Sequence, residues 1–265
     1  MKGALFAGPG AQVIRWVTYH NKFAAPTDEA YDPGQRMLPG YHYSYLVGVL
    51  IFWAAWIVSS IFGKRYRAEI RWGSLIAAPL ALTSLLFVPQ YWTPPSLFNL
   101  DKTIRVGIED FLWAAAVGGL ASVVGELLLK ERLAATRKLQ RKRRYAPFVF
   151  AVVVFVVLEA WHPGKTMENT IISLAFGALT LAYLRPDLLP LMLTSALSFT
   201  ALYFFLFLCF LFFYPEFVQR YYNLPNLLGI YFLGVPIEEL LFAATGGAVW
   251  SAAYEYVHGY IVRPQ

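Results

Sequence analysis

The sequence predicts an all-α membrane protein, a polytopic bundle of about seven transmembrane helices. Two parallel three-helix repeats, joined by a linker helix, are expected to make up this bundle. Of its 265 residues, 58% are hydrophobic and 14% are charged, whereas a soluble domain is about 45–50% apolar and about 25% charged. The mean hydropathy is +0.51. Both departures from soluble composition indicate a chain that lies largely in hydrocarbon.

The elements follow one another as apolar runs after a polar start. Residues 1–42 are rich in proline and glycine, and we expect them to form an arm outside the membrane. Each later run is long enough to cross or enter about 30 Å of hydrocarbon as a helix. The last run is long enough to leave the membrane before its end. The predicted spans are residues 43–62, 72–88, 105–129, 146–161, 166–184, 189–213 and 227–257.

The basic residues predict how these spans are oriented. Lysine and arginine gather in the gaps after the odd-numbered spans, most densely in residues 130–144. By the positive-inside rule these gaps face the cytoplasm, so the N-terminus is outside and the C-terminus inside. We therefore expect an integral protein of the cytoplasmic membrane, in contact with the lipid bilayer. The net charge of +6 has the same cause, and no nucleic-acid partner is expected.

Two of the apolar runs repeat each other without a gap. GIEDFLWAAAVGGLASVVGE runs from Gly107 to Glu126, and PIEELLFAATGGAVWSAAYE runs from Pro236 to Glu255. A helix rich in leucine and alanine and then an aromatic–proline loop precede each of them. Three spans plus one linking span return the chain in the same orientation, so the repeats are parallel. The expected division is a first repeat at 43–129, a basic linker with an extra helix at 130–165, and a second repeat with the tail at 166–265.

Each repeated run opens with two adjacent acids, Glu109-Asp110 and Glu238-Glu239. A preference for negative groups in the first helical turn explains one acid per helix. It explains two adjacent acids in both halves less well, because acids in hydrocarbon are costly and like charges repel. A protonated carboxylic acid can then exist near neutral pH. We expect Glu109 and Glu238 to look into one cavity between the two helices.

Aromatic side chains near the acid pairs are the candidate substrate-binding residues. Singly, each has an ordinary role in a core or an interfacial belt. Together they can line a dry cavity and stabilise a cation through their π faces. They are Trp92, Trp113, Tyr231, Phe232, Phe242 and Trp250.

Other residues of the repeats have simpler interpretations. Glu126 and Glu255 lie 16 positions past Asp110 and Glu239, about 24 Å along a helix at about 1.5 Å per residue. They are predicted to be anchors at the cytoplasmic interface. The glycine pairs at 118–119 and 246–247 are predicted to let helices approach closely.

No metal or cofactor is expected from the residue pattern. Adjacent acids point about 100° apart on a helix, whereas magnesium–diphosphate sites usually place carboxylates on one helical face. The four histidines are scattered, and Cys209 is the only cysteine. Neither set has the spacing of a zinc site.

At the acid pairs the chain resembles the membrane-embedded, flavin-independent lycopene cyclase domain family. That family includes heterodimeric bacterial and archaeal cyclases and the cyclase part of fungal fusion proteins. It carries a Pro-x-Glu-Glu/Asp motif before a Leu/Phe pair, once in each of two homologous three-helix units. Residues 236–242, PIEELLF, match this motif, and residues 107–113, GIEDFLW, match it with Gly107 in place of proline. The chain is thus similar to a divergent member.

The resemblance implies an intramembrane carotenoid or isoprenoid cyclase with an all-helical architecture distantly like that of intramembrane prenyltransferases. In this chemistry a terminal double bond is protonated, a nearby double bond attacks the cation, and a proton is lost. The resemblance implies Glu109 or Glu238 as the acid and Asp110 or Glu239 as its partner. The partner molecule would be a hydrophobic isoprenoid such as a carotenoid. A partner subunit or an oligomer is left open.

Two other functions are alternatives. An intramembrane prenyltransferase would use an isoprenyl diphosphate and would need Mg²⁺. A non-catalytic membrane protein would bind a lipid or a partner and keep the acid motifs as structural helix caps. Coloured or isoprenoid product from a lycopene-making host would separate these functions from the cyclase.

Overall fold

The computed structural model describes residues 40–129, 132–135 and 144–263. The predicted arm therefore lies almost wholly outside the described residues, and so do residues 130–131 and 136–143 of the basic linker. Within them, Tyr41–Tyr43 form a short 3-10 helix (η1) that leads directly into the first long helix.

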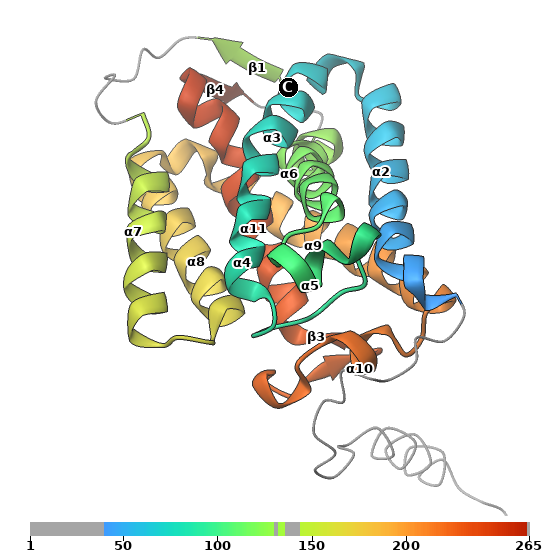
Figure 1. The fold of residues 1–265 in the computed structure, drawn as a ribbon. Coiled ribbons are helices and arrows are strands. Elements are labelled where there is room, and N and C mark those ends of the chain that lie inside the picture. The colour runs from blue at the N-terminus through green and yellow to red at the C-terminus, as the bar shows by residue number, and fades with distance from the viewer. Residues whose placement is uncertain (1–39, 130–131, 136–143, 264–265) are drawn as a thin grey trace, which may run out of the picture. The chain divides into compact units, whose positions relative to one another are not determined.

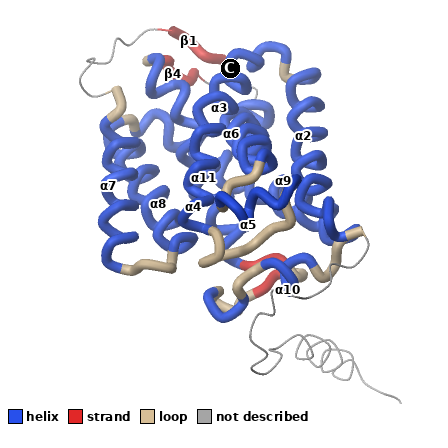
Figure 2. Tube along the Cα trace, in the orientation of Figure 1, coloured by secondary structure: helices blue, strands red, loops and turns tan. Residues whose placement is uncertain are grey.

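Long helices dominate the described chain (Figure 1), and the predicted all-α membrane-type bundle is confirmed. Short helical turns and two small pairs of strands make up much of the rest (Figure 2). The second span is a composite, in which α3 (Arg67–Ala77) continues through a 3-10 stretch (η3, Ala78–Thr83) into α4 (Ser84–Phe87). The other long helices are α2 (Ser44–Phe62), α6 (Ile108–Leu129), α7 (Ala146–Trp161), α8 (Thr166–Leu184), α9 (Leu189–Phe213) and α11 (Ile237–His258).

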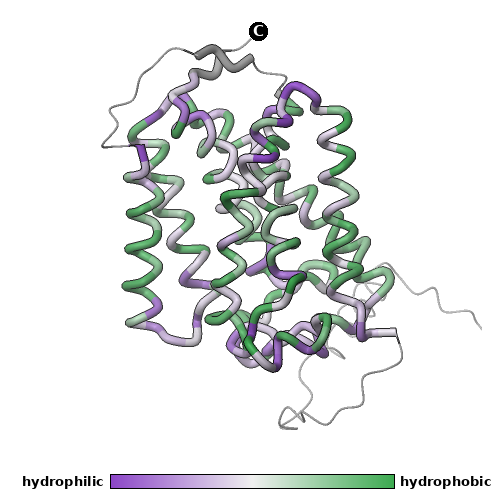
Figure 3. The backbone as a smooth tube through the Cα atoms, turned by 45° about the horizontal axis from the view of Figure 1, so that its top comes forward, coloured by the Kyte–Doolittle hydropathy of each residue, from purple (hydrophilic) through white to green (hydrophobic). Residues whose placement is uncertain are grey.

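Five helical stretches of the described chain are long and apolar enough to cross a membrane. Many residues of the helices are hydrophobic, as the colours of Figure 3 show, and several large apolar side chains are 66–84% exposed. Such surfaces are stable in lipid and are rare on soluble monomers. The protein is therefore an integral membrane protein, while its orientation stays a prediction. The exposed side chains include Phe62, Leu179, Tyr183, Leu197 and Phe212. The five stretches are Tyr41–Phe62, Lys64–Phe87, Ile108–Leu128, Thr166–Leu184 and Pro186–Phe213.

Two predicted boundaries are wrong. The second span begins at Arg67 rather than at residue 72. The last helix begins at Ile237 rather than at residue 227, because the preceding residues form a hairpin of β2 (Tyr231–Phe232) and β3 (Val235–Pro236). Gly229 and Gly234 have φ values of 73° and 86° there, which interrupts any helix before the acid pair.

Three helices contact one another at the centre of the bundle, namely α6, α9 and α11. Around them, α2 packs against α6 and α9, α3 against α6, and α8 against α11, while α7 packs against α8. The pairs α3–α6 and α9–α11 hold the same places in the two halves of the chain. The internal repeat itself stays a prediction.

The predicted packing role is confirmed for three of the four glycines. A Cβ atom at Gly118 would lie 2.8 Å from the carbonyl oxygen of Gly73 on α3, and one at Gly119 would meet the Trp56 indole. A Cβ at Gly247 would lie 2.9 Å from the carbonyl oxygen of Ser195 on α9. Gly246 differs, because a Cβ there meets no atom within 4 Å.

The two aromatic–proline loops pair with each other below the bundle. An isolated antiparallel bridge joins Trp92 to Tyr222. The backbone N–H of Thr93 donates to Tyr221 O at 2.7 Å, and that of Asn223 donates to Tyr91 O at 2.8 Å. Tyr221 ends the short helix α10 (Phe217–Tyr221). Loops from both halves of the chain thereby form one floor beneath α6 and α11.

The glycine contacts predict opposite effects for two neighbouring substitutions. Gly247→Ala forces the α9 backbone to shift and should destabilise the protein by about 1–3 kcal/mol. Gly246→Ala adds a methyl group to open space and should leave stability unchanged or raise it by up to about 1 kcal/mol. Thermal unfolding of both variants in the same detergent measures the difference. Equal midpoints would show that α9 and α11 do not approach closely at Gly247.

Candidate active site

A cavity of about 480 Å³ lies among the helices above the paired loops. Its lining is mostly apolar and aromatic. Apart from tyrosines, Glu239 is the one lining residue with an ionisable side chain. Trp113 and Phe242 both line it and stack on each other, with ring centroids 5.9 Å apart and planes at 22°. The predicted aromatic residues that line it are Trp92, Trp113, Phe242 and Trp250.

Three tyrosine hydroxyls surround the Glu239 carboxyl group. The Tyr203 hydroxyl donates to Oε2 at 2.5 Å. The hydroxyls of Tyr222 and Tyr91 donate to Oε1 at 2.8 and 3.0 Å. Glu239 itself is 4% exposed. A buried charge needs such hydrogen bonds to offset its lost hydration, so these hydroxyls stabilise the carboxylate that Glu239 becomes when it loses its proton.

The two loop tyrosines are fixed in their protonated form. Burial, and next the nearby Glu239 carboxylate, raise the pKa of the Tyr91 hydroxyl well above its usual value. The same two causes, in the same order, raise the pKa of the Tyr222 hydroxyl. Both groups therefore remain hydrogen-bond donors at any pH near neutrality.

The other inward-facing acid, Asp110, lies behind the cavity wall. It accepts a hydrogen bond from the Tyr45 hydroxyl at 2.7 Å and one from the Gly107 N–H at 2.8 Å. Tyr45 lines the cavity and meets Trp92 edge to face at 4.9 Å. Asp110 thus positions an aromatic wall rather than touching the cavity itself.

The expectation that Glu109 and Glu238 look into the cavity is wrong, because neither lines it. Glu109 accepts a hydrogen bond from the Leu97 N–H at 2.6 Å, and Glu238 accepts one from the Leu228 N–H at 2.5 Å. Successive helical residues point about 100° apart. The first acid of each pair therefore fastens the preceding loop, and the second acid faces inward.

Tyr231 and Phe232 do not line the cavity either. They form β2, are 39% and 57% exposed, and Phe232 packs against Phe204 with ring centroids 5.3 Å apart. The observed hairpin, which stands in place of the predicted helix, leaves both side chains exposed.

Sequence reasoning missed the tyrosines around the acids. Tyr91 and Tyr222 stand at matching places in the two aromatic–proline loops, and that correspondence was an available signal. Tyr203 is a polar-tipped residue within a run of phenylalanines on α9, and a buried tyrosine hydroxyl usually has a partner. Tyr45 carried no signal, since it lies at an ordinary helix start.

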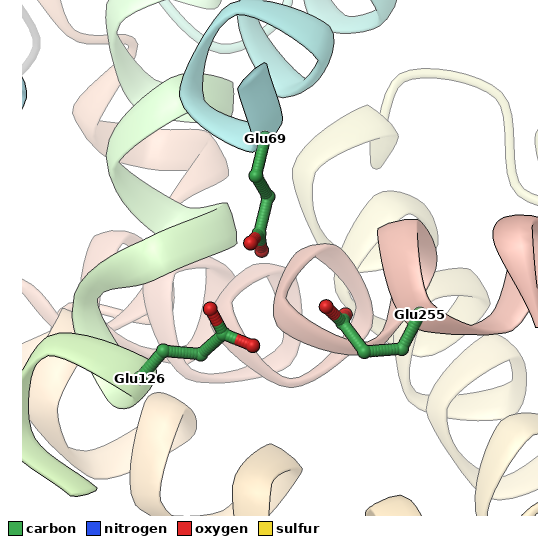
Figure 4. Close-up of side chains that lie close together, drawn as sticks. All are labelled: Glu69, Glu126 and Glu255. Atoms are coloured by element: carbon green, nitrogen blue, oxygen red, sulfur yellow. The ribbon is translucent and has the colours of Figure 1, made fainter. Parts of the chain in front are cut away.

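The prediction that Glu126 and Glu255 anchor the chain at the interface is wrong. Both side chains are 0% exposed. They meet Glu69 of α3 inside the bundle, with one carboxylate oxygen from each residue within 4.8 Å of the others (Figure 4). Glu69 was not foreseen because it reaches the other two acids only through the packing of α3 against α6 and α11.

A comparison with known protein families matches the second half of the chain. Residues 165–257 match the family model of lycopene cyclase. This is the family that the acid motifs resemble. The matching segment contains α8, α9 and α11, and with them Tyr203, Tyr222 and Glu239. No curated protein and no solved structure matches the chain.

The tyrosine cluster predicts that Tyr203→Phe destabilises the protein by about 1–3 kcal/mol, because it leaves a buried carboxyl oxygen of Glu239 without its hydrogen-bond donor. Tyr183→Phe is the matched control, since Tyr183 is 84% exposed on α8 and its hydroxyl is not part of the cluster. Denaturant unfolding in detergent compares the two. Equal stability of both variants would mean that Glu239 does not depend on the Tyr203 hydroxyl.

Proposed function

We propose that this protein is an intramembrane carotenoid or isoprenoid cyclase that closes a ring by acid-initiated, non-redox chemistry. The observation that carries the proposal is Glu239, a carboxyl group encircled by tyrosines in an aromatic cavity. It lies in the segment that matches the lycopene cyclase family.

Glu239 supplies the proton in the proposed mechanism. The carboxylic acid protonates the terminal double bond of the isoprenoid, which leaves a tertiary cation on the substrate. The three tyrosine hydroxyls donate to the carboxylate that forms, so they stabilise the transition state more than the starting acid. The sequence favoured Glu109 or Glu238 as the acid. The proposed mechanism assigns this role to Glu239 instead, because its side chain lines the cavity.

Ring closure then needs no further reagent. A neighbouring double bond attacks the tertiary cation, and a new carbon–carbon bond forms. The ring cation loses a proton to the Glu239 carboxylate, which restores both the acid and a neutral product. Trp113 and Phe242 face the same cavity, and their π faces stabilise the cation while it exists.

The cavity is suited to a substrate that arrives through the lipid. Four of its lining residues are also 50–60% exposed on the outer surface, which places an opening between η3 and α7. The exposed lining residues are Ile76, Leu80, Tyr145 and Val152. A volume of about 480 Å³ accommodates the ring-forming end of a long isoprenoid, while the remaining chain extends through the opening into hydrocarbon.

A prenyltransferase fits this cavity less well. Its diphosphate substrate would bring several negative charges, and no lysine, arginine or histidine lines the cavity. Release of diphosphate from an isoprenyl diphosphate by the purified protein would favour the prenyltransferase, whereas the cyclase predicts none. The non-catalytic alternative predicts that acid-to-amide changes alter stability and no chemistry.

The mechanism predicts that Glu239→Gln lowers cyclised product by about 10²–10⁴-fold, the usual contribution of a positioned general acid. Glu238→Gln, a matched control on the adjacent position, should keep turnover within about tenfold because that side chain fastens a loop. The measurement is chromatography of carotenoids from a lycopene-making host, with membrane protein levels matched by immunoblot. Full product from Glu239→Gln would overturn the proposal, and so would loss confined to Glu238→Gln.

A further inference from the structure

A second group of buried acids lies at the other end of the bundle from Glu239. Glu69 comes from α3, Glu126 from α6 and Glu255 from α11, and their exposed fractions are 1%, 0% and 0%. One carboxylate oxygen from each lies within 4.8 Å of the other two, and the three groups point toward a shared space (Figure 4). Glu255 follows Glu239 by 16 residues on α11, about 24 Å along the helix.

Two of these acids, Glu69 and Glu255, lack the kind of partners that surround Glu239. Within the described residues, both carboxylate oxygens of Glu69 and both of Glu255 are buried and have no hydrogen-bond partner. The basic group that acts on Glu255 is Arg185, whose guanidinium already pairs with both oxygens of Asp187 at 2.7 and 2.6 Å. Acids buried in this way either share protons or need a counter-charge.

The geometry fits a small cation. Hard divalent cations bind oxygen ligands at about 2.0–2.6 Å, so ligands on opposite sides of one ion lie about 4–5 Å apart. The observed limit of 4.8 Å falls in that range. Three carboxylates also supply up to six oxygens, a number that Ca²⁺ accepts, whereas Mg²⁺ would take one oxygen from each acid and keep waters in its remaining positions.

We propose that Glu69, Glu126 and Glu255 bind one hard divalent cation, of the class of Mg²⁺, Mn²⁺ or Ca²⁺. The ion neutralises two of the three buried charges and connects α3 and α6, from the first half of the chain, to α11 in the second. It serves as a structural cross-link, because binding to the folded state alone stabilises that state. The site stands apart from the cavity, and the proposal does not depend on cyclase activity.

Metal binding by the purified full-length protein tests the proposal. The protein in detergent is stripped with a chelator, dialysed and titrated with Mn²⁺, and bound ion is counted by electron paramagnetic resonance. We expect one tightly bound Mn²⁺ per chain and a rise of several degrees in the thermal midpoint. Mg²⁺ or Ca²⁺ should compete for the same site.

Two isosteric variants locate the ion. Glu126→Gln should weaken Mn²⁺ binding at least tenfold and remove the thermal shift. Glu159→Gln is the control, because its carboxylate on α7 bonds to Thr166 and Asn169 outside the cluster, and it should bind Mn²⁺ like the wild type. The variant Glu239→Gln should also bind Mn²⁺ normally, which separates this site from the proposed catalysis.

The number of ions that the wild-type protein binds tests the proposal even where a variant fails to fold. If the stripped protein takes up none of the three cations at millimolar concentration, the proposal is overturned and the acids are held by shared protons. Equal affinity in Glu126→Gln would overturn it as well, because the ion would then lie elsewhere.

Discussion

The cost of placing carboxyl groups inside a membrane bundle governs this structure. Hydrocarbon offers no hydrogen bonds, so each buried acid needs partners from the protein or from a bound species. The buried acids of this protein have three kinds of surroundings. Backbone N–H groups of the loops donate hydrogen bonds to Glu109 and Glu238. Tyrosine hydroxyls donate to Asp110 and Glu239. Three further acids, among them Glu126, lie together in one cluster.

The two acid pairs share a design and differ in chemistry. In each, the first acid fastens the loop before its helix and the second faces inward. Asp110 has one tyrosine and sits behind the wall, whereas Glu239 has three tyrosines and reaches the cavity. The proposed catalysis is therefore concentrated in the second half of the chain, and the first half supplies aromatic walls and the pairing loop.

Hydropathy predicted the long helices well, and the spans at 166–184 and 189–213 agree with α8 and α9. Hydropathy failed at residues 227–236, where glycines and a proline form a hairpin. These residues are apolar enough to resemble part of a membrane helix. The repeat located both acid pairs, yet the inward-facing member depends on helix rotation and on loop contacts. Glu69 joins its cluster only through the packing of α3, α6 and α11, which no local pattern encodes.

The central claim is that the Glu239 carboxylate, which its three tyrosines stabilise, faces a substrate cation in an aromatic cavity. An isoprenoid amine, with a protonated nitrogen in place of the cationic carbon, tests it directly because analogues of a transition state bind more tightly than substrates. The measurement is the Kd of this amine against that of an uncharged analogue of the same shape. We predict a preference of at least tenfold for the amine in the wild type, lost in Glu239→Gln. An equal preference in both proteins would contradict the claim.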